Sequence, residues 1–420
     1  MNKQKVLLLA LAGITSLISS CGSSNNGELI GVQDRKPWYQ TEPEGMVFVP
    51  QGVLQAGQSD QDVMFNLNSP ARTVSVKAFY MDDTEISNNE YRQFVYWVRD
   101  SLAHKMLDHV TEDAYGKERI DWKQKIDYNS AETQQELAAL YVPESEQTNG
   151  YPELDAAKLN YKYKFYDFAG AAKRENFGKP RVNFTKDVSL NIYPDTLVWV
   201  RDFSFSYNDP QTQHYFAHPA YDEYPVVGVS WDQANAFCNW RTQLINGYRT
   251  NKGQPENPPY RLPTEWEFEY AARGGRNSSP YPWGGPYIRN DKGCFLANFK
   301  PGRGNYSDDG GLYTVKVRSY EPNDFGLYNM SGNVAEWTTT AYDEAIYNTV
   351  HDLNPDYKYS AKAEENKVMK RKVVRGGSWK DIGFMLQNST RTYEYQDTSK
   401  SYIGFRCAMD FLGRSLEDFK

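Results

Sequence analysis

The sequence has no long run of basic residues and no excess of positive charge. Among its 420 residues, 47 lysines and arginines stand against 54 aspartates and glutamates, which gives a formal net charge of −7. Proteins that bind nucleic acid need clustered positive charge to neutralise phosphates. We therefore expect no nucleic-acid partner.

Motifs of common catalytic sites are also missing. The sequence contains neither a Gly-X-Ser-X-Gly elbow nor a phosphate-binding loop. Histidine is scarce, with five in the chain. His214 and His218 have the spacing of two helical zinc ligands, but no acid lies between them and Pro219 follows. We interpret this pair as coincidental, so nothing here indicates a hydrolase, a kinase or a zinc protease.

The apolar run near the start, Val6–Ile18, is too short to cross a bilayer comfortably. It follows Lys3 and Lys5, as in a secretory signal peptide. It ends in Ile-Ser-Ser-Cys21, which resembles a lipobox. We expect a lipoprotein signal peptide over residues 1–20, acylation of Cys21, and a lipidated tether over residues 21–44. The alternative is an ordinary signal peptide with a chance cysteine.

The most distinctive stretch present is Asn323–Trp337, which has the periodicity of neither a helix nor a strand. Its glycines and asparagines favour a rigid, irregular loop. Within eight residues it offers side-chain oxygens that suit a hard cation such as calcium, from Asn329, Asn333 and Glu336. A purely structural loop is the alternative.

Periodicity and capping signals predict the regular elements. Ser87 with Glu90 forms a capping box before a helix, and Thr264 with Glu267 repeats the pattern. Ser230 is expected to cap a third helix, over residues 231–243. We expect strands at residues 45–50, 72–80, 196–200, 312–317, 372–374 and 403–409.

Residues from about 101 to 218 interrupt the family resemblance described below, which implies that they form a large insert. Within it, Leu159–Phe168 alternates aromatic and basic residues. This pattern predicts either a strand with one aromatic face that can bind another surface, or a helix. Because aromatic residues are enriched in interface cores, we expect it to contact a partner protein. A packed excursion of the domain is the alternative.

Four motifs in order resemble the formylglycine-generating-enzyme/sulfatase-modifying domain family. They begin at Arg261-Leu-Pro-Thr, Asn323-Asp-Phe-Gly, Val374-Arg-Gly-Gly-Ser-Trp and Gly404-Phe-Arg-Cys. The resemblance extends to the stretches that start at Gly45 and Phe79. It implies an α+β, loop-rich variant of the C-type-lectin fold over residues 45–412, interrupted by the insert.

The enzymes of that family hold copper(I) with two cysteines shortly after the Arg-Gly-Gly-Ser-Trp motif, and soft thiolates suit this ion. The matching positions here are Asp381 and Leu386, and no cysteine lies between Trp379 and Cys407. We therefore expect neither copper nor formylglycine-generating activity, which makes the chain a pseudoenzyme.

The resemblance also implies structural sites. It assigns a calcium ion to Asn329, Gly332, Val334 and Glu336, and a second one, with less regular spacing, to Asn298, Phe299, Asp309 and Gly311. It pairs Cys238 with Cys407 as a disulfide, which would leave Cys294 as a free, buried thiol. The alternative is that all three thiols are reduced, since buried free cysteines are common.

Several longer stretches are similar to the GldK/PorK lipoprotein family, among them Ile192-Tyr-Pro-Asp-Thr196 and Ser401-Tyr-Ile-Gly-Phe-Arg406. This resemblance implies a non-catalytic component of the type IX secretion system, a protein-transport machine, that is also needed for gliding motility. It implies a lipid anchor on the periplasmic face of the outer membrane and self-association in a ring with a GldN/PorN-type partner. The competing hypothesis is a calcium-dependent lipoprotein that binds glycans or the cell wall.

Overall fold

The first and last strands of the domain lie in one sheet, on either side of β4 (Phe79–Asp82). In the computed structural model, β1 (Met46–Val49), β4 (Phe79–Asp82), β14 (Ala408–Asp410) and β9 (Tyr260–Arg261) form a four-stranded antiparallel sheet in that order. A second four-stranded sheet has the order β12 (Thr392–Tyr395), β11 (Arg371–Arg375), β10 (Ala335–Ala341) and β13 (Ile403–Gly404), with β10 and β13 parallel. Three hairpins complete the strands: β2 (Gly52–Ala56) with β3 (Arg72–Val76), β5 (Val110–Glu112) with β6 (Glu118–Ile120), and β7 (Asn160–Tyr166) with β8 (Thr185–Asn191).

The structure describes residues 39–58, 67–112, 116, 118–147, 152–202 and 208–413. Residues 40–413 form one compact unit, and the two chain ends form another, of which only Tyr39 is described. The predicted signal peptide, the acylated Cys21 and most of the tether lie outside the described residues. Gln40, which the prediction placed in the tether, is buried and bonds the carbonyl of Asp410, so the domain begins before residue 45.

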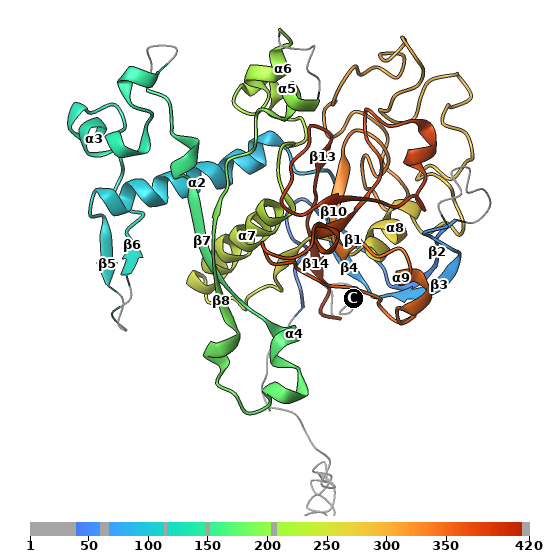
Figure 1. The fold of residues 1–420 in the computed structure, drawn as a ribbon, viewed down its shortest axis with the longest axis horizontal. Helices are drawn as coiled ribbons and strands as arrows, with labels where there is room; N and C mark the ends of the chain where they lie inside the picture. Colours follow the sequence, from blue (N-terminus) through green and yellow to red (C-terminus); the bar gives the residue numbers. More distant parts are fainter. Residues whose placement is uncertain are drawn as a thin grey trace, which may run out of the picture. The chain divides into compact units, whose positions relative to one another are not determined.

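Three long helices flank the sheets, and each begins at a capping box (Figure 1). The predicted caps at Ser87 and Thr264 are confirmed, and Ser230 caps the third helix with Gln233. These helices are α2 (Asn88–Met106), α7 (Trp231–Asn251) and α8 (Glu265–Arg273). The described residues also contain five short helices: α3 (Ala131–Glu136), α4 (Phe168–Ala171), α5 (Val198–Asp202), α6 (Pro210–His214) and α9 (Ile346–Thr349).

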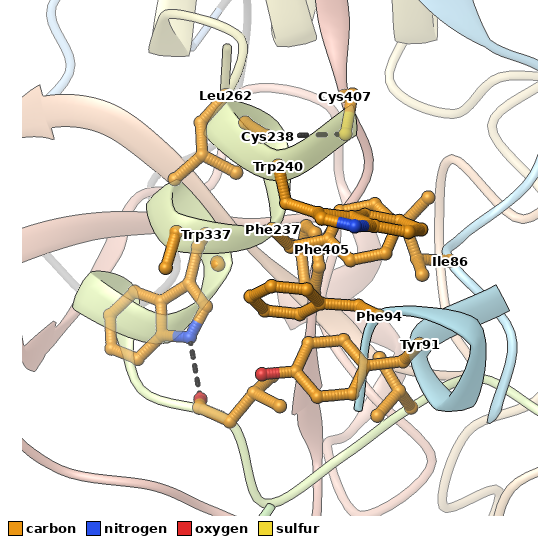
Figure 2. Close-up of a cluster of buried hydrophobic side chains, with 14 of the residues drawn as sticks. Ile86, Tyr91, Phe94, Phe237, Cys238, Trp240, Leu262, Trp337, Phe405 and Cys407 are labelled. Carbon is orange, nitrogen blue, oxygen red and sulfur yellow. Dashed lines mark hydrogen bonds between the residues drawn. The ribbon is translucent and has the colours of Figure 1, made fainter. Parts of the chain in front are cut away.

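Aromatic rings join α2 to α7 in the main core (Figure 2). Tyr91 stacks on Phe237 with ring centroids 5.6 Å apart, and Phe94 packs against Trp240 at 5.1 Å. Phe405, which precedes β14, packs edge-on against Phe237. The apolar face of α2 therefore contributes to the core. Within the described residues, no helix is both long and apolar enough to cross a membrane.

Several predicted strands differ from the structure. Residues 196–200 were expected as a strand, but α5 occupies this region because Asp195 accepts the amide of Leu197 and turns the chain. Residues 312–317 form no strand, since the amide of Val315 bonds the Asn333 side chain instead of a neighbouring strand. The expected strands 72–80 and 403–409 each divide into two strands that belong to different sheets.

The insert starts later than residue 101, because α2 continues to Met106. Leu159–Phe168 becomes strand β7, and its aromatic face packs on the domain itself. Tyr161 contacts Phe94, and its hydroxyl bonds Asn239 of α7 at 3.0 Å. The start of β7 therefore packs on the domain, as the alternative prediction of a packed excursion has it. Phe165 and Phe168, further along, remain exposed.

Candidate functional site

Residues 323–334 form an irregular loop, as the sequence predicts, and strand β10 begins at Ala335. Residues 329–337 are buried, whereas Asp324 is exposed. Asn329 and Asn333 both have positive φ, 49° and 61°. Gly332 also has positive φ, and a Cβ there would lie 2.5 Å from the carbonyl oxygen of Asn298. Only glycine fits this position, because both the backbone angle and the close approach exclude a side chain.

This loop packs around the side chain of Glu85, which comes from the segment before α2 and which the sequence did not indicate as a site residue. Its carboxylate accepts hydrogen bonds from the side-chain amides of Asn329 at 3.0 Å and Asn333 at 2.9 Å. Glu85 is fully buried, and this burial, together with the nearby charge of Glu336, raises its pKa to about 8. The sequence feature that could have indicated Glu85 is the pair Asn329 and Asn333, because a buried side-chain amide needs a hydrogen-bond acceptor.

Glu336 already has a counter-ion. Its two carboxylate oxygens accept hydrogen bonds from Arg406, each at 2.7 Å, and both side chains are buried. Arg406 also donates to the carbonyl of Tyr328 at 2.9 Å. The residues of the first predicted calcium site therefore do not fit the ion as arranged, because the only carboxylate among them is neutralised by a guanidinium.

The second predicted set fits an oxygen-liganded cation better. Asp309 accepts the amides of Phe299 at 2.6 Å and Gly311 at 3.1 Å, which brings three of the four residues together. The side-chain oxygen of Asn298 is buried without a hydrogen-bond partner and would lie 2.9 Å from a Cβ at position 311. An orphaned buried oxygen beside a carboxylate suits calcium.

No group of three or more histidine, cysteine, aspartate or glutamate side chains with metal-binding geometry occurs in the part of the chain that the structure describes. A cation at the Asn298 site would therefore depend on amide and carbonyl oxygens beside the single carboxylate of Asp309. Burial raises the pKa of that carboxyl above its usual range. A bound cation would lower this pKa again.

Asp381 and Leu386, which the resemblance matches to the copper ligands of the enzymes, provide no metal-binding chemistry of that kind. Leu386 is fully buried in an apolar cluster with Tyr281 and Phe299. Asp381 accepts a hydrogen bond from the hydroxyl of Ser378 at 2.6 Å, and burial raises the pKa of its carboxyl. Neither an aliphatic side chain nor a carboxylate provides the soft ligands that copper(I) requires.

Cys238 and Cys407 lie side by side between α7 and β14, both buried, with their sulfur atoms 3.4 Å apart (Figure 2). Both thiols are free in this structure, so the predicted disulfide stays a prediction. Cys294 is also free, but it is exposed, and its expected burial is wrong. Its segment turns at the surface, where the Asn290 side chain accepts the amide of Cys294.

A second buried ionic network supports the motif Arg375-Gly-Gly-Ser-Trp379. The carboxylate of Glu269 bonds Arg375 and also Arg273, the latter at 2.7 Å, and all three side chains are buried. Nearby, Arg391 pairs with Glu265 at 2.6 Å. Each guanidinium is paired with a carboxylate, so this network holds α8 against β11 and offers no free nucleophile or base.

Comparisons with known proteins agree with this architecture. The family model described as "Sulfatase-modifying factor enzyme 1-like domain" matches residues 33–411. The formylglycine-generating enzyme of Bos taurus is 27% identical over 428 residues, which cover 96% of this chain and 88% of that protein. Inactive C-alpha-formylglycine-generating enzyme 2 of Bos taurus is 33% identical over 192 residues, which cover 44% of this chain and 50% of that protein.

Among solved structures, PvdO from Pseudomonas aeruginosa aligns with a TM-score of 0.48 at 17% identity, covering 87% of this chain and 94% of PvdO. The similar proteins thus include both an enzyme and a protein named as inactive. Because the family model covers most of the chain, this protein belongs to the sulfatase-modifying factor enzyme 1-like domain family.

Proposed function

We propose that this chain is a non-catalytic structural lipoprotein of the type IX secretion and gliding machinery. In this proposal it sits on the periplasmic face of the outer membrane and forms a ring with a GldN/PorN-type partner. The observation that supports the non-catalytic part is that Asp381 and Leu386 stand at the positions that the family resemblance matches to the copper-binding cysteines. The resemblance of several longer sequence stretches to the GldK/PorK lipoproteins is the basis for proposing a role in the secretion machinery.

The surroundings of Leu386 support a scaffold rather than a damaged enzyme. The side chain is fully buried in an apolar cluster, so the position that we match to a copper ligand belongs to the core here. In this proposal the domain, to which we assign a lectin-like fold, binds other protein chains through its surface and catalyses no reaction. A ring built from head-to-tail contacts needs two different surfaces on each copy, and the insert can supply one that the enzymes lack.

Copper binding and peptide oxidation test the non-catalytic part. The purified protein is titrated with copper(I), and a cysteine-containing sulfatase peptide is incubated with it under oxygen and analysed by mass spectrometry. We expect no stoichiometric copper and no formylglycine, and a Bos taurus-type formylglycine-generating enzyme serves as the positive control. Turnover of the peptide would contradict the proposal.

The lipid anchor is tested through Cys21. Because acylation requires the thiol, Cys21→Ser should release the protein from the membrane fraction or leave the signal peptide attached. Fractionation and the mass of the intact protein measure this. If both are unchanged, the anchor lies elsewhere. Cys294→Ser, at an exposed cysteine, is the matched control and should change neither.

We also propose structural calcium at Asn298, Phe299, Asp309 and Gly311. The ion would bind the orphaned oxygen of Asn298 and the carboxylate of Asp309, and would stiffen the loop between them. Chelation should lower the melting temperature of the wild type but not of Asp309→Asn. Direct metal analysis measures the occupancy, and absence of calcium together with no effect of chelation would contradict the site.

A further inference from the structure

The hairpin β7–β8 ends in a tip that the domain core does not cover. We define the hairpin tip as residues 168–183, which include α4 at the far end of the hairpin (Figure 1). Five large apolar side chains of the described residues are 72% to 79% exposed, and three of them belong to the tip: Phe168, Phe177 and Val182. Such a concentration marks an interaction surface, since single exposed apolar residues are normally scattered.

The charge of the hairpin tip is opposite to that of the whole chain. The tip has one acidic residue, Glu175, against four basic residues, whereas the chain has a net charge of −7. None of the four basic side chains forms a salt bridge with a residue that the structure describes. Arg181 lies over the ring of Tyr166, and Lys179 bonds the Asn176 side chain, while all four stay exposed: Lys173, Arg174, Lys179 and Arg181.

The hairpin tip lies near the point where the chain enters the domain. Gln40, at this entry, bonds the carbonyl of Asp410 at 3.1 Å and accepts the amide of Leu412 at 2.7 Å. Phe168 lines the same surface depression as Asp410. Seventeen residues separate Cys21 from Tyr39, and a chain of that length reaches at most about 60 Å. If Cys21 is acylated, as proposed above, the tip lies on the side of the domain from which the chain leads to the bilayer.

We propose that the hairpin tip docks on a membrane surface that contains anionic phospholipids. Phe168, Phe177 and Val182 would enter the interfacial region, where aromatic rings are favoured, and the four basic side chains would contact lipid phosphates. The lipid anchor alone would leave the orientation of the domain free. The tip gives it a second point of attachment and therefore a fixed face toward the bilayer.

Vesicle binding tests this without the anchor or any partner protein. The processed chain, residues 21–420 with Cys21→Ser, retains the whole compact unit and carries no acyl group. We expect it to cosediment with vesicles of phosphatidylcholine and phosphatidylglycerol, but not with phosphatidylcholine alone. Added salt should weaken the binding, because attraction to anionic lipids is screened.

Two double variants locate the binding at the hairpin tip. Lys173→Glu with Arg174→Glu should lower the binding constant about tenfold or more, since each basic residue near an anionic surface contributes on the order of 1 kcal/mol. Phe168→Ser with Phe177→Ser should lower it comparably. Lys123→Glu with Lys125→Glu makes the same charge change at exposed lysines elsewhere in the insert and should retain most of the binding. Thermal melting confirms that the variants are folded.

The proposal is wrong if the parent chain does not bind the anionic vesicles, or if the control variant loses as much binding as the tip variants. It is equally wrong if the tip variants bind vesicles normally but lose a co-purifying protein, because the tip would then be a protein-contact surface. Failure of vesicle binding leaves the ring proposal untouched, since that proposal is judged by co-purification.

Discussion

The carboxylate of Glu269 compensates two buried guanidinium groups, those of Arg273 and Arg375. Glu269→Gln would leave these charges without a full counter-charge in a buried site, which typically costs about 3–5 kcal/mol. We expect a loss of that order in the free energy of unfolding, measured by urea denaturation. Glu344→Gln, at an exposed glutamate, is the matched control. A loss no larger than that of the control would show that the network does not stabilise the fold.

Glu85 predicts a pH dependence of stability. Its pKa is raised from 4.5 to about 8 by burial and by Glu336. The folded state therefore retains a proton that the unfolded state releases, so this contribution to stability is complete below pH 4.5 and is lost as pH rises toward 8. Between these two pKa values the slope should be at most about 1.4 kcal/mol per pH unit.

Glu85→Gln should remove this slope, because the amide stays neutral while Arg406 keeps Glu336 as its partner. Urea denaturation of wild type and variant from pH 5 to pH 8 measures the difference. The variant should be less destabilised, relative to wild type, at pH 8 than at pH 5. Parallel curves would mean that Glu85 is ionised throughout. Glu364→Gln, at an exposed glutamate, controls for the change of charge.

The hairpin β7–β8 combines two elements with different roles. Its stem contributes Leu159 and Tyr161 to the main core, and the hydroxyl of Tyr91 bonds the carbonyl of Ile192 where the hairpin ends. Replacing residues 168–183 by Asn-Gly, a favoured hairpin turn, should leave the melting temperature nearly unchanged. Deleting residues 159–192 should lower it strongly, because large cavities open in the core.

Calorimetry of the two deletions distinguishes the roles. Equal melting temperatures for both would show that the insert is an independent appendage. A large loss on removing the tip alone would show that the tip is part of the core. Deletion of the tip is therefore the better test of its proposed role at the membrane surface, since loss of binding in the larger deletion could follow from unfolding.

The elements that the sequence predicted well are those with local signals. Capping boxes fix the starts of α2 and α8, because the cap and its partner are three residues apart. Strands that pair with distant segments were predicted poorly. The sequence predicts one strand over residues 72–80, but Lys77 and Ala78 separate two strands that belong to different sheets. Which sheet each strand joins depends on distant segments of the chain.

The candidate site shows the same limit. Asn329, Asn333 and Glu336, which we singled out as possible cation ligands, are all buried, but their hydrogen-bond partners come from distant parts of the chain. Glu85 lies 244 residues before Asn329, and Arg406 lies 70 residues after Glu336. Spacing within the loop could not show that an arginine neutralises Glu336, so calcium was assigned to a position that a guanidinium already fills.

At the scale of the whole molecule, Cys238 and Cys407 would close a loop of 169 residues if oxidised. In the chain-entropy model such a bridge stabilises by on the order of 4–5 kcal/mol, and by less where the bond is strained. We expect protein from an oxidising compartment to show a cross-linked peptide of these two cysteines. Reduction should then lower its melting temperature. Three alkylatable thiols, or a bridge to Cys294, would contradict the pairing.

The mass of the particle purified from solubilised outer membrane tests the central claim most directly. The account predicts that the tagged protein elutes as a megadalton complex with a second protein in fixed proportion, and that the complex contains no stoichiometric copper. A monomer that is retained on glycan beads in a calcium-dependent manner, or a monomer that oxidises a cysteine peptide, would contradict it.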